Sequence, residues 1–233
     1  MRVLVLGSKG RQGRRFSAIL RYLKEEVVEA DIGDKWWTWE FDRAIVSTPT
    51  QSHFGDLAML VDSGKPTLCE KPVTKSKRLM DCLISAPGSQ NIRMVSNWLY
   101  ALNPVLLRCR GPEGGQGAVA SLGEMKIDYA SYVTGEDGLF WDCCQLLYLA
   151  GRFKWDTTYP GWECVVDGQH RVTLEDIQDS YVTMVSDWLY SEHNRCWTLE
   201  DAVKANAKVE WALKHCVEGE QGEINFSGMA VTP

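Results

Sequence analysis

The feature that most constrains the fold is a short apolar run that leads directly into a glycine-rich turn. Residues 2–6 (RVLVL) have the composition of a parallel strand buried on both faces. The segment Gly7 to Gly13 follows at once, and a helical pattern begins after it, with apolar residues at Phe16, Ile19, Leu20 and Leu23. Strand, glycine turn and helix in this order are the context that a dinucleotide-binding fingerprint requires.

The glycines of this turn have separate roles in such a fingerprint. The first allows a tight turn, the second lets the backbone approach a pyrophosphate, and the third lets helix and strand pack closely. The helix N-terminus adds N–H donors and a positive dipole end. The spacing is Gly-x-x-Gly-x-x-Gly, one residue longer than the commonest form. The predicted pyrophosphate site is therefore Gly7, Ser8, Lys9, Gly10, Arg11, Gln12 and Gly13.

A second predicted strand, residues 26–30, ends at Asp31. A carboxylate that follows the glycine turn at this distance is placed to bind the ribose hydroxyls of adenosine, and it repels a 2′-phosphate. This favours NAD over NADP, although Arg11, Arg14 or Arg15 could fold back onto a 2′-phosphate. The alternative is that Asp31 is a turn residue before Gly33.

The next strand, residues 43–47, follows after an unusually short connection. We infer an abbreviated crossover, with Trp36, Trp37 and Trp39 covering that edge of the sheet. A polar loop, Thr48 to His53, comes at the end of the strand, where α/β proteins bind ligands. A helix through Leu57, Leu60 and Val61, a strand at 66–69, a helix at 76–85 and a strand at 92–96 are expected to follow.

Composition excludes several classes of protein. Apolar residues make up 45% and charged residues 24% of the 233 residues, so the chain can bury a core. A net charge of −6 argues against nucleic acid or an acidic membrane as the main partner. No apolar run approaches the length of a membrane helix, and no secretory signal is recognised. We therefore expect a cytoplasmic protein.

The cysteines and histidines give no sign of a metal centre. The eight cysteines show no Cys-x-x-Cys spacing and the four histidines are scattered. We expect reduced thiols that act as small core residues, and no bound metal.

The order of these motifs resembles a known family. The glycine turn, STPTQSH, a helix ending in SGKP and then LCEKPVTKS follow one another along the chain. This combination is similar to the Gfo/Idh/MocA family of nicotinamide-dependent oxidoreductases, which includes inositol dehydrogenases, nucleotide-sugar dehydrogenases and biliverdin reductases.

The resemblance implies roles for two loops. It implies that the loop after the third strand contacts the cofactor, and that the Glu-Lys-Pro turn lies beside the nicotinamide, with its proline peptide often cis. It also implies that Lys71 binds or polarises the reacting oxygen; the alternative is a turn ion pair with Glu70. The added cofactor-site residues are Ser47, Thr48, Pro49, Thr50, His53, Glu70, Lys71 and Pro72.

The second half departs from the family pattern. A helix predicted over 139–151 has Trp141 and Cys144 where the family usually has a His and an Asp. Asp142 and Gln145 share a helix face one position away, and the alternative is that they form a solvated face. Tyr100 lies in the segment VSNWLYALNP, which resembles the family's entry into its second domain. Tyr100 and Asp142 are the candidate proton relays, with Lys71 as the catalytic cation.

The remaining segments complete a smaller second domain. We expect a strand over 123–133, a hairpin around Asp167-Gly168, and two helices that each begin Thr-Leu-Glu-Asp, at Thr173 and Thr198. The expected architecture is α/β: a Rossmann doubly wound parallel sheet over residues 1–96, and a shortened α+β domain with an open sheet over 97–233. One arrangement left open is that the C-terminal helices pack back on the first domain. The shortened domain leaves a sheet face uncovered, and an exposed apolar sheet face favours a homodimer or larger oligomer.

The resemblance implies an NAD-dependent oxidoreductase that moves a hydride between nicotinamide and a sugar-, cyclitol- or nucleotide-sugar-like secondary alcohol or ketone. Two alternatives remain open. Reduction of a conjugated acceptor such as a bilin needs no strict His-Asp pair, and a regulator or scaffold that binds NAD(P) needs no catalysis at all. NADP is the less favoured cofactor.

Overall fold

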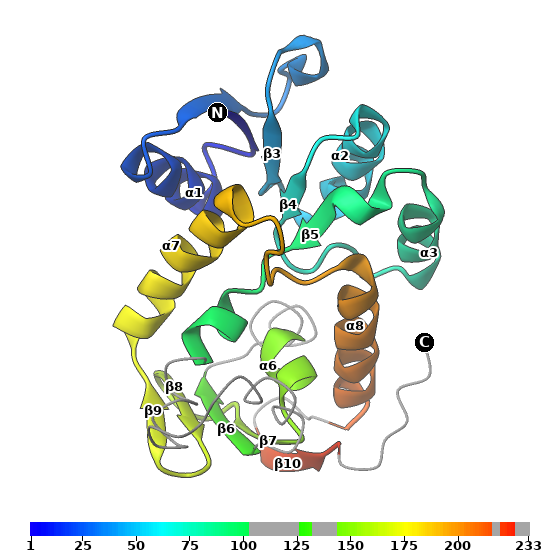
Figure 1. Ribbon diagram of the computed structural model, residues 1–233. Helices are drawn as coiled ribbons and strands as arrows, with labels where there is room; N and C mark the ends of the chain where they lie inside the picture. Colours follow the sequence, from blue (N-terminus) through cyan, green and yellow to red (C-terminus); the bar gives the residue numbers. More distant parts are fainter. Residues whose placement is uncertain (103–125, 132–143, 216–219, 227–233) are drawn as a thin grey trace. The chain divides into compact units, whose positions relative to one another are not determined.

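A computed structural model covers the chain, and it describes residues 1–102, 126–131, 144–215 and 220–226. The chain forms two compact units (Figure 1). The first unit consists of Met1–Val95 and Val182–Val203, and the second of Ser96–Tyr181 and Lys204–Pro233. Each unit is built around its own five-stranded sheet.

The sheet of the first unit is entirely parallel, in the order β2-β1-β3-β4-β5. Its strands run over Arg2–Leu6 (β1), Glu26–Ala30 (β2), Arg43–Val46 (β3), Thr67–Cys69 (β4) and Ile92–Met94 (β5). The expected doubly wound sheet is therefore confirmed. Its central strands are almost wholly apolar because helices cover both faces, and Val3, Leu4 and Val5 are completely buried.

The helices of this unit follow from the strand order. α1 (Arg11–Tyr22) connects β1 to β2 in one direction, whereas α2 (Thr50–Ser63) and α3 (Lys77–Ser85) connect strands in the opposite direction. Because such crossovers are right-handed, α1 lies on one face and the contacting pair α2 and α3 on the other. Between β2 and β3 the chain makes only the 3₁₀ turn η1 (Trp36–Thr38), so the abbreviated crossover is also present, and a second such turn, η2 (Ser89–Asn91), precedes β5.

Two long helices each pass from one unit to the other. They are α7 (Leu174–Tyr190) and α8 (Leu199–Leu213). Both start with the predicted cap: Asp176 N–H donates to Thr173 Oγ1 at 3.1 Å, and Thr173 N–H donates to the Asp176 carboxylate at 2.8 Å. Thr198 and Asp201 repeat this reciprocal pair at 3.3 and 3.0 Å.

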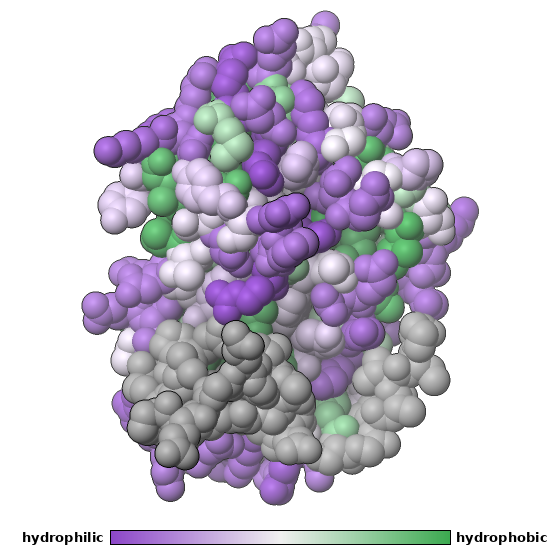
Figure 2. Space-filling view, viewed as in Figure 1, coloured by the Kyte–Doolittle hydropathy of each residue, from purple (hydrophilic) through white to green (hydrophobic). Residues whose placement is uncertain are grey.

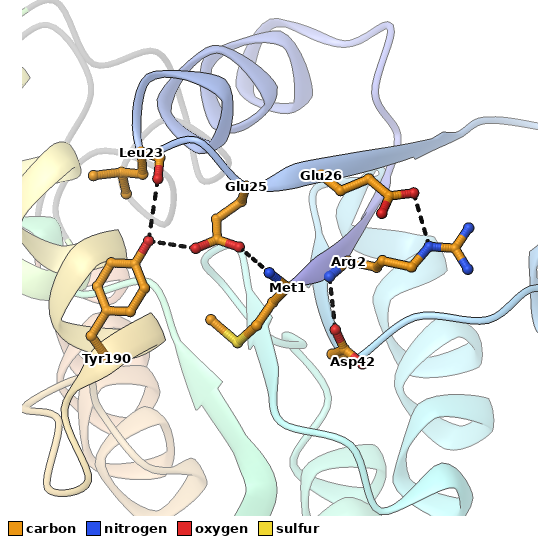
Figure 3. Close-up of polar contacts among 7 residues, drawn as sticks. All are labelled: Met1, Arg2, Leu23, Glu25, Glu26, Asp42 and Tyr190. Atoms are coloured by element: carbon orange, nitrogen blue, oxygen red, sulfur yellow. Dashed lines mark hydrogen bonds and ion pairs between the residues drawn. The ribbon is translucent and has the colours of Figure 1, made fainter.

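The last turn of α7 is fastened to the first unit. Tyr190 donates its hydroxyl proton to Glu25, which also binds the amino group of Met1 (Figure 3). The Glu25 carboxylate raises the pKa of Tyr190 to about 12, because it accepts the phenol proton. Two residues earlier, Trp188 accepts a hydrogen bond on its carbonyl from Arg43 at 3.1 Å, and the Arg43 guanidinium lies over its ring. These contacts explain why the C-terminal half of α7 belongs to the first unit.

The sheet of the second unit has the order β10-β7-β6-β8-β9. Its strands are Lys126–Ser131 (β6), Arg152–Asp156 (β7), Trp162–Val166 (β8), His170–Val172 (β9) and Gln221–Asn225 (β10), and the helix α6 spans Cys144–Leu149. β6 and β7 are parallel and the other pairs are antiparallel. The hairpin turn at Asp167 and Gly168, where both residues have positive φ, agrees with the expectation.

Strict alternation divides this sheet into an apolar and a charged face. The buried side chains are Ile127, Tyr129, Phe153, Trp155, Cys164, Val166, Val172 and Ile224. The other face carries the ion pairs Lys126–Asp128, Arg171–Glu163 and Arg152–Glu223. Within the described strands the outward face is therefore charged. The apolar exposure that we expected to drive self-association is not found there.

Two strands of this sheet, β7 and β10, are not predicted from the sequence pattern. The predicted strand 123–133 is shorter where it is described, as β6, and residues 139–143 of the predicted helix lie outside the described residues.

In the view of Figure 2, the described surface is mostly hydrophilic, with hydrophobic residues in small groups. No helix in the described part of the chain is long and apolar enough to span a membrane.

Candidate functional site

The glycine turn closes tightly between β1 and α1. Gly7, at φ +76°, donates its N–H to the carbonyl of Ala30 at 2.9 Å, and Gly10 N–H donates back to the Gly7 carbonyl at 3.0 Å. A Cβ on Gly13 would lie 2.1 Å from the Gly7 oxygen, and one on Gly7 would lie 2.7 Å from the carbonyl oxygen of Ser47. Both positions therefore exclude a side chain, as a close turn-to-helix approach requires.

The N-terminus of α1 is left open for an anion. Its N-cap residue is Gly10, which provides no side-chain acceptor for the first-turn N–H groups, and the first turn contains no acidic residue. The helix has 12 residues, so its dipole places partial positive charge at this end. Together with the side-chain-free glycines, this end fits a pyrophosphate group.

Asp31 is held rigidly at the end of β2. Its carboxylate accepts hydrogen bonds from Ile32 N–H at 2.8 Å and from Lys9 N–H at 2.9 Å, so it joins β2 to the glycine turn. These two backbone donors lower the pKa of Asp31, with the Ile32 bond the stronger cause. Asp34 in turn accepts the N–H of Asp31 at 2.8 Å. The carboxylate is therefore ionised and fixed in position at neutral pH.

A cavity of about 270 Å³ opens at the carboxyl ends of β1, β2 and β3. This is the point where the crossovers reverse direction, which is where doubly wound sheets bind ligands. Three carboxylates and two indole rings contribute to its walls. The lining residues are Leu6, Gly7, Ala30, Asp31, Ile32, Gly33, Asp34, Trp36, Trp37, Thr48, Ser52 and Asp56.

His53 lies beneath the loops rather than in this cavity. It is completely buried, with Nδ1 2.9 Å from the carbonyl oxygen of Pro72 and Nε2 2.7 Å from that of Thr48. Burial lowers its pKa, although the two carbonyls and Asp56 oppose this shift. His53 thus connects the loop after β3 to the loop after β4, and it positions both. Thr48 also donates its hydroxyl proton to Asp56 at 2.6 Å.

The Glu70-Lys71-Pro72 turn follows β4 and contains a cis peptide bond before Pro72. Glu70 and Lys71 are both buried, at 3% and 9% exposure. One oxygen of Glu70 accepts Lys71 N–H at 3.0 Å, and the other has no hydrogen-bond partner. Burial raises the pKa of Glu70, while the charge of Lys71 opposes the shift. A buried, unsatisfied acceptor next to a lysine is a feature of ligand sites more than of turns.

The candidate proton relays belong to the second unit. Tyr100 is buried within a helical stretch at 97–102, and Asp142 lies outside the described residues. Gln145 is completely buried: its side-chain oxygen accepts Trp98 N–H at 2.9 Å, and its amide lies 3.3 Å from Asn97 Oδ1. The proposed solvated face therefore does not include Gln145, which holds the start of the second unit in place.

Several of the predicted site residues come together at one edge of the first sheet. These are the glycine turn, Asp31, the loop after β3 and the turn after β4. The cavity wall also contains Ser52, Asp34 and Asp56, which the sequence motifs do not predict as site residues. Asp34 has a recognisable signal, since Asp-Ile-Gly-Asp directly after a strand is a turn that returns a second carboxylate to the strand end. Asp56 has none, because it lies inside α2.

Within the described residues, no three His, Cys, Asp or Glu side chains gather as a metal site. Among the described cysteines, Cys69, Cys82 and Cys164 are free thiols. Burial raises the pKa of Cys69 and of Cys164, so these thiols are inert at neutral pH.

Solved structures share this fold over nearly the whole chain. A myo-inositol dehydrogenase from Corynebacterium glutamicum aligns with 97% of this chain and 99% of its own, with a TM-score of 0.67 and 12% identity. A Gfo/Idh/MocA family oxidoreductase from Vibrio cholerae aligns with 93% of this chain and 97% of its own, with a TM-score of 0.65 and 13% identity.

The WlbA dehydrogenase from Thermus thermophilus, solved with NAD and UDP-GlcNAcA, aligns with 94% of this chain and 96% of its own, with a TM-score of 0.63 and 13% identity. No family model and no curated protein sequence matches the chain. The fold of Gfo/Idh/MocA-type oxidoreductases, expected from the motifs, is thus confirmed at the level of structure.

Proposed function

We propose that this protein is an NAD-dependent oxidoreductase that acts on a secondary alcohol or ketone of a sugar-, cyclitol- or nucleotide-sugar-like substrate. The observation that carries the proposal is the ionised carboxylate of Asp31, fixed between β2 and the glycine turn at the wall of a cavity. The structures with this fold include a myo-inositol dehydrogenase and a dehydrogenase solved with NAD and a nucleotide sugar, which supports the substrate class.

The residues of the first unit divide the work of binding such a cofactor. The open N-terminus of α1 and residues 7–13 would bind the pyrophosphate, and Asp31 would accept hydrogen bonds from the ribose hydroxyls. Ser47 to Thr50 and the turn from Glu70 to Pro72 would form the side toward the nicotinamide, with His53 holding those two loops together. When bound, NAD supplies the redox chemistry, and the protein supplies orientation and charge.

Lys71 is the proposed catalytic cation. It would donate a hydrogen bond to the reacting oxygen of the substrate and stabilise negative charge that develops there. Its burial strengthens this interaction, because a site with little water screens charge weakly. Tyr100 and Asp142 remain the proposed proton relays.

The first test is a calorimetric titration of the wild-type protein with NADH and with NADPH. We expect tighter binding of NADH, because a 2′-phosphate would meet the carboxylates of Asp31 and Asp34. The Asp31→Asn variant keeps a hydrogen-bond acceptor but loses the charge, so it should reduce the ratio between the affinities for NADH and NADPH. Equal or reversed affinities of the wild-type protein would contradict the assignment of Asp31.

One observation favours a second candidate, a cofactor-binding regulator or scaffold without catalysis. α6 places the buried thiol of Cys144 where the family resemblance implies the Asp of an acid–base pair, and the next residue, Gln145, has a structural role. A screen with NADH and diverse carbonyl and conjugated acceptors, bilins included, distinguishes the two candidates. Turnover with any of them supports the enzyme, and cofactor binding without turnover supports the regulator.

We also propose that the protein is a homodimer, formed through the charged face of the second sheet. This face carries both signs of charge, in the pairs of Glu163 with Arg171 and of Arg152 with Glu223. Alternating charges allow a sheet face to contact a second copy of itself without like-charge repulsion.

A further inference from the structure

The cavity at the end of β2 has an unusual feature, which is exposed apolar side chains. Ile32 is 94% exposed and Trp37 is 54% exposed, and both line the same cavity. Large apolar side chains left in water at a cavity wall commonly mark a surface that a ligand covers. The other walls are polar, with carboxylates at Asp31, Asp34 and Asp56.

The position of Trp37 follows from the abbreviated crossover. β2 and β3 are connected by the single turn η1 instead of a helix, and this turn carries two adjacent indoles. Trp36 is buried, at 7% exposure, and anchors the turn. Its ring meets that of Trp37 edge to face, with centroids 6.0 Å apart. One indole therefore supports the other, whose ring is left at the cavity.

The chemistry of the walls selects the kind of ligand. Carboxylates accept hydrogen bonds from hydroxyl and amino groups and repel phosphate, while an indole offers a flat apolar face for an aromatic ring. A cavity of about 270 Å³ is slightly smaller than the usual range for sites that bind whole drug-sized ligands, so it suits one part of a larger ligand. A purine ribonucleoside with free ribose hydroxyls combines these properties.

We infer that Trp37 is the stacking platform for the adenine of the bound dinucleotide. The turn that connects β2 to β3, where a longer crossover would have a helix, carries this indole. This inference rests on the proposed cofactor, and it adds a specificity residue to that site. Asp31 would bind the ribose, and the indole would provide most of the contact with the base. Ile32 would cover a further part of the same cavity wall.

The test uses ADP-ribose, which contains the adenosine and both phosphates but no nicotinamide. Trp37→Ala should weaken ADP-ribose binding by about ten-fold or more in calorimetry, the scale of losing one base-stacking ring. Trp37→Phe keeps an aromatic face and should stay within about three-fold of the wild type. Trp37 is half exposed, so neither substitution removes a core residue.

Trp39→Ala is the matched control. Trp39 follows the same turn but does not line the cavity, so its loss should leave ADP-ribose affinity unchanged. Intrinsic fluorescence gives a second readout. Quenching by ADP-ribose should be smaller in Trp37→Phe than in the wild type, and should persist in Trp39→Ala.

The outcomes separate this inference from the proposed function. If Trp37→Ala binds ADP-ribose as tightly as the wild type, the inference is wrong while the NAD proposal stands. If ADP-ribose binding depends on Trp37 but no acceptor is turned over with NADH, the inference stands and the oxidoreductase does not. If the wild type binds neither ADP-ribose nor NADH, both are overturned.

Discussion

At the scale of single residues, the site is built from buried charged groups that ordinary cores avoid. Glu70 and Lys71 are adjacent and buried, and Glu70 keeps one oxygen without a hydrogen bond. Burying such groups costs folding free energy, which a stable protein tolerates where function needs them. The proposed roles of these two residues lead to separate predictions.

The first concerns Lys71. We expect Lys71→Ala to reduce turnover by roughly two or more orders of magnitude, the scale of losing one positioned electrostatic donor. NADH affinity should change much less, because the glycine turn and Asp31 lie elsewhere in the site. Lys77→Ala, at the exposed start of α3, is the control. Retention of most activity in Lys71→Ala would reduce Lys71 to a turn residue.

The second concerns the pKa of Glu70. In the folded state this pKa is raised, so Glu70 keeps its proton over a pH range in which the unfolded chain has lost it. Its contribution to stability is therefore fully present below the unfolded pKa and is lost as pH rises through the folded pKa.

Glu70→Gln removes this titration. The stability of the variant relative to the wild type should therefore increase as pH rises above the ordinary range of a glutamate. Urea unfolding of both proteins at pH values from about 4 to about 8 measures the difference in their free energies of unfolding. A difference independent of pH would show that folding does not change the pKa of Glu70, which would contradict the raised pKa.

At the scale of elements, the strands and helices of the first unit agree closely with those predicted from the sequence, whereas those of the second unit agree less well. Three features are local signals: the alternating Val and Leu residues of β1, the glycine turn and the paired Thr-x-x-Asp caps. Each could be predicted without knowledge of the partner strands. β7 and β10 are different. β10 pairs with β7 from a distant part of the chain, and its sequence QGEIN carries only one buried residue, Ile224. A strand with so little apolar content is defined by its partner.

The same limit applies to the site. The residues of the glycine turn, Asp31 and the loop after β3 are predicted by order and spacing, because a parallel sheet brings the carboxyl ends of its strands together. The inward orientation of His53 and Gln145 could not be predicted. Each is a buried polar residue whose hydrogen bonds reach a segment far away in the sequence. His53 binds the loop at Pro72, and Gln145 binds the segment at Trp98.

A prediction at this scale compares two helical glycines. Gly13→Ala should destabilise the protein and abolish cofactor binding, because its Cβ would lie 2.1 Å from the Gly7 carbonyl oxygen, inside van der Waals contact. Gly55→Ala in α2 meets nothing within 4 Å and should stabilise the protein by about 0.5–1 kcal/mol, since alanine loses less backbone entropy in a helix. Thermal unfolding measures both, and equal effects would contradict the tight packing of the turn.

At the scale of the whole molecule, the proposed homodimer makes a prediction about salt. Light scattering at micromolar concentration and low ionic strength should give about twice the 26.3 kDa chain mass. Because the proposed interface is charged rather than apolar, added salt should shift the population toward monomer.

Lys154→Glu, which changes one charge on that face, should have the same effect as salt. A single 26 kDa species under all conditions would exclude the dimer.

The return of residues 182–203 to the first unit has a practical consequence for anyone wishing to isolate the nucleotide-binding half. The backbone passes between the units three times, after Val95, Tyr181 and Val203. A fragment ending at residue 95 would therefore lack the end of α7, and would leave Arg43 and Glu25 without their partners Trp188 and Tyr190. To express the first unit on its own, the gene must be redesigned so that the segment 182–203 follows residue 95 through a flexible linker.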